Sequence, residues 1–194
     1  MTPLQICNEA LMRMKQNPIS AIPEAGDTTS GKNAIACRDQ FPLALAKITT
    51  QYPWRWARKL ATLVRSDSSV EMYTYYYTLP TDLERVNVVL DTEGAPIGET
   101  FEFVGDSLYT DAEEVVLNYG ADMSSSTNIP QHIASAVVFQ LAEDLGAFLE
   151  SDRTNDHIER LRMALIQAKR QDAQLDVRSY GVADSTNSAI SLYQ

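Results

Sequence analysis

Residues 51–64, QYPWRWARKLATLV, lie between two kinds of sequence. On their N-terminal side, apolar residues recur every three or four positions, which is the spacing of a helix with one buried face. On their C-terminal side, apolar and polar residues alternate in short acidic runs, which is typical of half-buried strands. Trp54 and Trp56 stand at the junction, where we expect a helix to end and a strand to begin.

Two helices are predicted before this junction. The first covers residues 3–15. Asn17-Pro18 stops it, because a residue that precedes proline avoids the helical conformation. After a loop rich in turn-forming residues, a second helix begins within residues 30–33 and reaches Tyr52. Pro42 lies in its apolar stripe, so we expect a kink or a split there, since proline lacks an N–H and clashes with the preceding turn.

The middle of the chain predicts short strands. Their ranges are residues 73–79, 84–90, 97–104, 107–110 and 115–119. Short strands joined by tight turns favour an antiparallel sheet. Pro130 then opens a third helix, and the break at residues 152–155 is short enough for an antiparallel pairing with a fourth.

The last residues, 178–194, are small and polar and hold too few apolar side chains for a core of their own. The predicted fold class is therefore α+β: a helical bundle of about four helices with an inserted antiparallel β region and an extended C-terminal tail. The predicted segments are residues 1–60 for the first part of the bundle, 61–125 for the β region, 126–177 for the helical hairpin and 178–194 for the tail.

Charge is distributed unevenly along the chain, whose formal net charge is −10. Residues 1–66 hold nine basic and four acidic residues. Residues 67–150 hold one basic residue and sixteen acidic ones, and residues 151–194 hold six of each. The net charge thus changes from +5 to −15 across the junction. The acidic segment is either a solvated surface or one that repels a polyanion or docks on a basic partner. Tight nucleic-acid binding through it is not expected, because that requires lysine and arginine.

The chain has few candidates for chemistry. Cys7 and Cys37 are expected to be buried free thiols, and His132 and His157 lack companions at metal-ligand spacing. No metal, cofactor or catalytic residue is therefore predicted. Paired carboxylates can hydrolyse glycosides, and the strand region holds Glu102, Asp106, Glu113 and Glu114, but sixteen acids produce such pairs by chance. No run of eighteen apolar residues occurs, and we expect no membrane-spanning segment and a reducing cytoplasm.

Two other features have a structural and a binding interpretation. Trp54 and Trp56 are expected to pack at the junction, with base stacking beside Arg55, Arg58 and Lys59 as the alternative. The tail is either a terminus without function or a segment that orders on a partner's sheet edge or in a groove. Its apolar and aromatic residues are Tyr180, Val182, Ile190, Leu192 and Tyr193.

The order of these pieces resembles the head-to-tail adaptors of short-tailed bacteriophages, the tail tubular protein A family. The resemblance covers most of the chain. It is carried by ICNEALMRMKQNPISAI, YPWRWA, YTLPTDLERVNVV, FVGDSLYTD, IPQHIASAVVFQLAEDLGAFLESD and HIERLRMALIQAKRQDAQLD. The chain departs from the family at residues 15–17, Lys-Gln-Asn, where a glycine-containing turn is usual.

The resemblance implies a non-enzymatic virion protein at the head–tail junction, made in the cytoplasm of the host bacterium. About a dozen copies would form a ring that joins the portal protein to the tail nozzle protein and encloses the DNA exit channel. The tail would dock on the portal, and double-stranded DNA would pass without specific binding. Acids expected to face the channel or the nozzle are Glu99, Glu102, Asp106, Asp111, Glu113 and Glu114. The alternatives are a neck connector of a long-tailed phage, a virion-associated wall hydrolase and a nucleic-acid-binding module.

Overall fold

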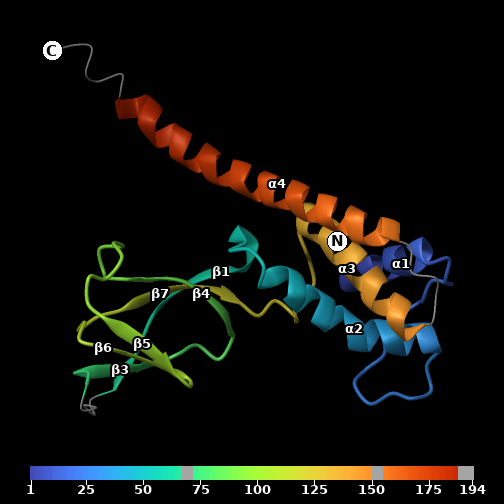
Figure 1. Cartoon of the computed structure of the whole chain (residues 1–194), viewed down its shortest axis with the longest axis horizontal. Coiled ribbons are helices and arrows are strands. Elements are labelled where there is room, and N and C mark those ends of the chain that lie inside the picture. The colour runs from blue at the N-terminus through green and yellow to red at the C-terminus, as the bar shows by residue number, and fades with distance from the viewer. Residues whose placement is uncertain (67–71, 150–154, 188–194) are drawn as a thin grey trace. The chain divides into compact units, whose positions relative to one another are not determined.

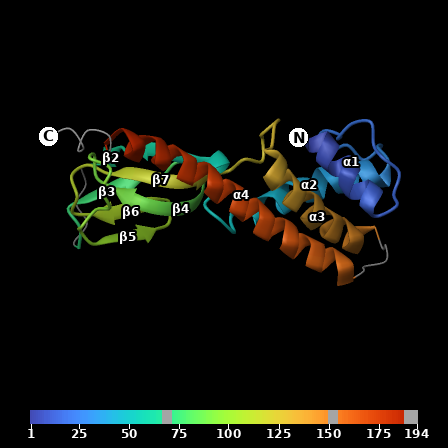
Figure 2. The same ribbon diagram turned by 90° about the horizontal axis from the view of Figure 1, so that it is seen from above.

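The chain forms two compact units in a computed structural model, which describes residues 1–66, 72–149 and 155–187. One unit, the helical unit, comprises Met1–Ile48 and Ser124–Gln194, and the other, the sheet unit, comprises Thr49–Met123. The sheet unit is thus inserted between two parts of the helical unit. Figures 1 and 2 show the elements of both.

The helical unit is built on α1 (Pro3–Arg13), α2 (Lys32–Thr49), α3 (Gln131–Phe148) and α4 (Asn155–Asn187). Thr2 caps α1, because its hydroxyl accepts from the Gln5 N–H at 3.3 Å while the Gln5 side chain accepts from the Thr2 N–H at 2.9 Å. α3 packs against both α1 and α4 (Figure 1). α2 is not split at Pro42 but remains one helix.

The helices bury one apolar core. α1 contributes Ile6 and Leu11, and α3 contributes Ile133, Leu141 and Leu145, all fully buried. Lys47 of α2 and Asp144 of α3 form an ion pair of 2.7 Å beside this core.

Cys7 and Cys37 are free and fully buried in the same core. A hydrogen bond with Cys37 and burial raise the pKa of the Cys7 thiol, so that thiol stays protonated.

The sheet unit follows a short 3-10 turn, η1 (Arg55–Ala57). Its strands are β1 (Arg58–Thr62), β2 (Arg65–Ser66), β3 (Tyr75–Thr78), β4 (Leu83–Leu90), β5 (Phe101–Val104), β6 (Ser107–Thr110) and β7 (Val116–Ala121). They form a three-stranded sheet in the order β1-β7-β4 and a four-stranded sheet in the order β2-β3-β6-β5, and every pairing is antiparallel.

Both sheets contribute side chains to a single core. Its members are Leu63, Tyr77, Val89, Leu108, Ala112, Val115, Leu117, Tyr119 and Ala121. The Tyr77 hydroxyl lies 2.7 Å from the carbonyl oxygen of Ala112 and 2.8 Å from that of Glu113, which satisfies its only buried polar group.

The predicted fold class is wrong, because the structure is a mixed fold of four helices and two antiparallel sheets. A single antiparallel sheet was expected from strands that follow one another closely. Instead β3 pairs with β6 and β4 pairs with β7, so most pairings join strands distant in sequence. Strand alternation identifies which face is buried but not which strand is the partner.

The tail was also predicted to be extended from residue 178, and this is wrong for residues 178–187, which continue α4. Glycine, serine and threonine make this segment a poor helix by itself. Adding residues to an existing helix avoids the nucleation step, however, and α4 is already packed against α3. Residues 188–194 lie outside the described part of the chain.

Candidate assembly surface

Among the residues that the structure describes, the two sheets have four outer strands, β1 and β4 in one and β2 and β5 in the other. Two of them, β1 and β5, differ in charge. β1 pairs with β7 alone, and β5 pairs with β6 alone, among the residues that the structure describes. An edge strand carries backbone N–H and C=O groups along its outer side that can pair with another chain. Both edges therefore qualify as places where a partner could add a strand.

The β1 edge is basic. Arg58 and Lys59 are exposed at its start, followed by Leu60, of which 65% is exposed. The Lys59 ammonium lies 2.5 Å from a carboxylate oxygen of Asp82, which raises the pKa of Lys59 and lowers that of Asp82. Val64, just beyond the strand, is 77% exposed. The β1 edge therefore exposes both basic and apolar side chains to solvent.

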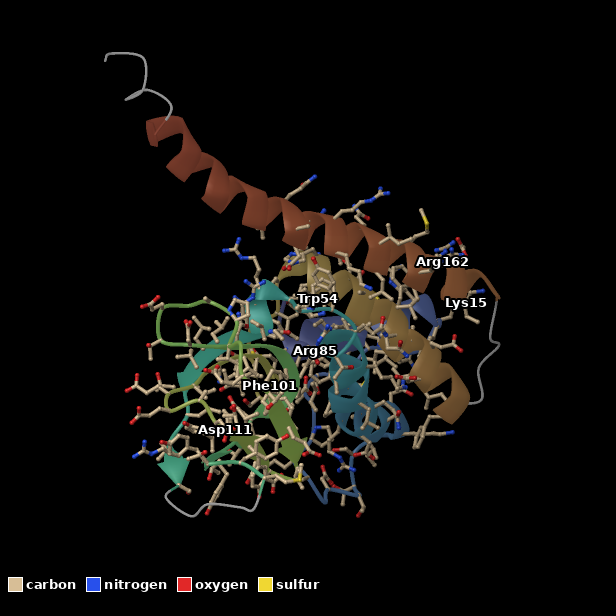
Figure 3. All side chains as sticks on the ribbon, turned by 60° about the vertical axis from the view of Figure 1, so that its left-hand side comes forward. Lys15, Trp54, Arg85, Phe101, Asp111 and Arg162 are labelled. Carbon is tan, nitrogen blue, oxygen red and sulfur yellow. The ribbon has the colours of Figure 1, made fainter. Side chains whose placement is uncertain are left out.

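The β5 edge is acidic and aromatic. All four of its residues are exposed, including Phe101 at 42% and Phe103 at 37%. Their rings meet edge to face with centroids 5.8 Å apart, and Glu102 stands between them in sequence. Figure 3 shows Phe101 on the sheet unit. Exposed aromatic rings on an unpaired edge are typical of a surface that another protein covers.

All six acids predicted to face a channel or nozzle are exposed. Glu99, Glu113 and Glu114 line one open recess of about 590 Å³, together with Asp91. Glu102 lies on β5, and Asp106 lies in the turn that follows it. The recess therefore concentrates negative charge at one place on the sheet unit.

Asp111, the sixth acid, has a local structural role. Its carboxylate accepts from the hydroxyl of Thr74 at 2.7 Å and from the Thr74 N–H at 2.8 Å. These bonds lower the pKa of Asp111. Asp111, which Figure 3 labels, thereby links the residue before β3 to the end of β6.

The two tryptophans of the junction lie in different surroundings. Trp54 precedes η1, is 1% exposed and contacts Tyr52 with ring centroids 4.9 Å apart. Trp56 lies inside η1 and is half-buried. Trp54 is thus too deeply enclosed to stack on a nucleobase.

The tail residues divide between two groups. Tyr180 and Val182 belong to α4, which is helical to Asn187. Ile190, Leu192 and Tyr193 lie outside the described residues. The predicted portal-docking set is therefore not one extended segment.

No group of three or more histidine, cysteine or acidic side chains gathers as a metal site within the described ranges. Among the same residues, no helix is both long and apolar enough to cross a membrane. The chain matches no protein-family model and no curated protein sequence.

Sequence reasoning did not find the two edges. Phe101 and Phe103 alternate with Glu102, which predicted a strand but not its place in a sheet. In the structure Phe103 does lie opposite the buried Leu108, but β5 is the last strand of its sheet. The available signal was the acidic residue between two aromatic ones, because charged side chains are one of the features that protect exposed edge strands.

Proposed function

We propose that this chain is a structural virion protein without enzymatic activity, a ring-forming adaptor at the head–tail junction. It joins the portal protein to the tail nozzle protein, and its ring encloses the path of the DNA. The order and spacing of the sequence pieces that resemble the tail tubular protein A family support this proposal. They extend from residues 6–22 at the front to residues 157–176 in α4.

The observation that carries the proposal is the length of α4. His132, in the first turn of α3, contacts Asp172 of α4. α4 then continues to Asn187, and at about 1.5 Å per residue those fifteen residues extend about 22 Å past the start of α3. We call residues 173–187 the helical arm, because this part of α4 extends beyond the start of α3. Such an arm is suited to docking on another protein, which we propose is the portal.

The exposed acids support a role beside DNA. Phosphates would meet more carboxylates than cations there, although Arg65 is paired with Glu113 at 3.3 Å, so the duplex would be repelled and would not be held tightly. We propose that the acids around the recess, Asp91, Glu99, Glu113 and Glu114, face the channel or the nozzle.

Electron microscopy of the purified chain with and without the portal protein tests this proposal. The expected result is a ring of this chain on the portal, with α4 at the contact. Failure of the chain to bind the portal, or a ring with the recess acids only on its outer surface, would contradict the corresponding part of the proposal.

A zymogram on peptidoglycan tests the enzymatic alternative. We expect no clearing from the wild-type chain. Clearing that disappears in Glu102→Gln or Glu113→Gln would assign the chain to the wall hydrolases instead.

A further inference from the structure

We infer that the β5 edge of one copy of this chain pairs with the β1 edge of a second copy. The partner is thus another molecule of the same protein, and the contact is an edge-to-edge strand addition. This inference deepens the proposed ring-forming function and rests on it, because it states which surfaces hold neighbouring copies together.

Charge complementarity identifies the occupant. Four of the five basic residues of the sheet unit lie within residues 55–65, on or beside β1 and β2. Lys59 is paired with Asp82 in the same copy, and Arg65 is paired with Glu113. The exposed Arg58 is therefore the main cation that β1 offers to a neighbour.

β5 carries Glu102, with Glu99 before it and Asp106 after it, and no basic residue occurs between residues 86 and 152. The acidic residues of β5 on one copy therefore attract the basic residues of β1 on another copy. Two β5 strands placed side by side would instead bring acidic residues together, which repel each other.

The positions of the edges fit a head-to-tail contact. β1 leads into β2 through only Leu63 and Val64, and β2 is one edge of the four-stranded sheet. β5 is the opposite edge of that sheet. Two complementary patches on opposite edges of one unit form a heterologous interface, which repeats from copy to copy and closes when the rotation permits.

Apolar exposure gives the contact its driving force. The two edges hold five of the six exposed large apolar side chains described in the sheet unit: Leu60, Val64, Phe101, Phe103 and Val104. Burying them between copies removes apolar area from water and covers backbone groups that would otherwise invite nonspecific pairing. Four-residue strands make a modest contact singly, and repetition around a ring multiplies it.

A charge-swap experiment on the full chain tests the inference. Sedimentation equilibrium up to millimolar concentration compares the wild type with Glu102→Lys, Arg58→Glu and the double variant. Both positions are exposed, and Glu159→Lys on the exposed face of α4 is a control with the same charge change as Glu102→Lys. Circular dichroism checks that each variant is folded.

We expect the wild type to self-associate and each single reversal to weaken association about tenfold, because like charges then meet across the contact. The double variant should recover to within about threefold, since the pairing is restored with its signs exchanged. Glu159→Lys should behave as the wild type. A wild type that stays monomeric at millimolar concentration, or a double variant no better than the single ones, overturns the inference.

Portal binding by the same proteins separates this inference from the proposed function. If the wild type binds the portal but the charge swaps leave association unchanged, the edge contact is wrong while the adaptor function stands. If the swaps behave as expected but no protein binds the portal, the edge contact is right and the adaptor function is wrong.

Discussion

His132 of α3 lies against Asp172 of α4, with its Nε2 3.5 Å from the carboxylate oxygen Oδ1. Asp172 is the only charged residue among the buried side chains that the structure describes, with 3% of it exposed. A carboxylate so enclosed needs a polar partner, and the partner comes from the first turn of the neighbouring helix. The contact marks the position on α4 beyond which the helical arm begins.

Replacing His132 with alanine should destabilise the helical unit by about 1–3 kcal/mol, because it removes a polar contact of the enclosed Asp172 carboxylate. Urea unfolding followed by circular dichroism measures the change. Gln171→Ala, an exposed neighbour on α4, is the control and should stay within about 0.5 kcal/mol of the wild type. Equal stability of the two variants would show that the pair does not anchor α4.

Replacing Trp54 with alanine should destabilise the protein by about 3–5 kcal/mol, since a fully enclosed ring leaves a large cavity. Trp56→Ala should cost less, because Trp56 is only half-buried. Thermal unfolding of both variants gives the comparison. A larger loss for Trp56 would mean that the ring contact between Trp54 and Tyr52 is not what holds the junction.

Glu84 should make the sheet unit less stable at neutral pH than in weak acid. Burial raises the pKa of Glu84, against the hydrogen bond that its carboxylate accepts from Thr49 at 2.7 Å, and nearby Asp122 raises it further. The folded state therefore binds the proton more tightly than the unfolded state, so this group adds stability as the pH falls through its folded pKa and down to its ordinary value of 4.5.

Glu84→Gln should consequently raise the melting temperature at pH 7 and reduce its rise between neutral and weakly acidic pH. Glu93→Gln, in the exposed turn after β4, should leave both unchanged. Thermal scans across that range measure the difference. A lower melting temperature for Glu84→Gln at pH 7 would mean that the Thr49 bond outweighs the burial cost.

Asp27 has the opposite pH dependence. Its carboxylate accepts from the Ser30 hydroxyl at 2.6 Å and from the Thr29 N–H at 2.7 Å, and these bonds lower its pKa from 3.8 to about 2. The stability that it contributes is fully present above 3.8 and disappears as the pH falls toward 2. Asp27→Asn should therefore be less stable than the wild type at pH 7, and the gap should narrow in acid. A gap that is constant across the acid titration would contradict this.

The sequence predicted the places of most elements better than their partners. The helix before Trp54 and the strand after it follow from a change in hydrophobic period, which local sequence records. That β3 pairs with β6 and β4 with β7 depends on contacts between distant residues, which no local pattern contains. The exposed edges could not be predicted for the same reason. Phe101 is exposed because β5 is the last strand of its sheet, and the order of strands is not a local property of the sequence.

The helical arm also depends on context. Residues 178–187 include Gly181, Ser185 and Thr186, which disfavour a helix when taken alone. They are helical because α4 is already nucleated by its packing against α3 up to Asp172. Local propensity therefore predicted the wrong state, whereas the predicted use of this segment in docking still awaits its test.

Deleting residues 179–194 should abolish portal docking while leaving the folded units intact. The deletion removes the end of the arm but spares the contact of Asp172 with His132, so α4 keeps its place on α3. The melting temperature should therefore match the wild type, and cosedimentation with the portal protein should fall to background.

Deleting residues 188–194 alone is the graded control, because it leaves the helix complete to Asn187. Binding lost only on the longer deletion assigns docking to the last turns of α4, and binding lost on both assigns it to the final seven residues. Normal assembly of the longer deletion would show that the arm has no part in docking.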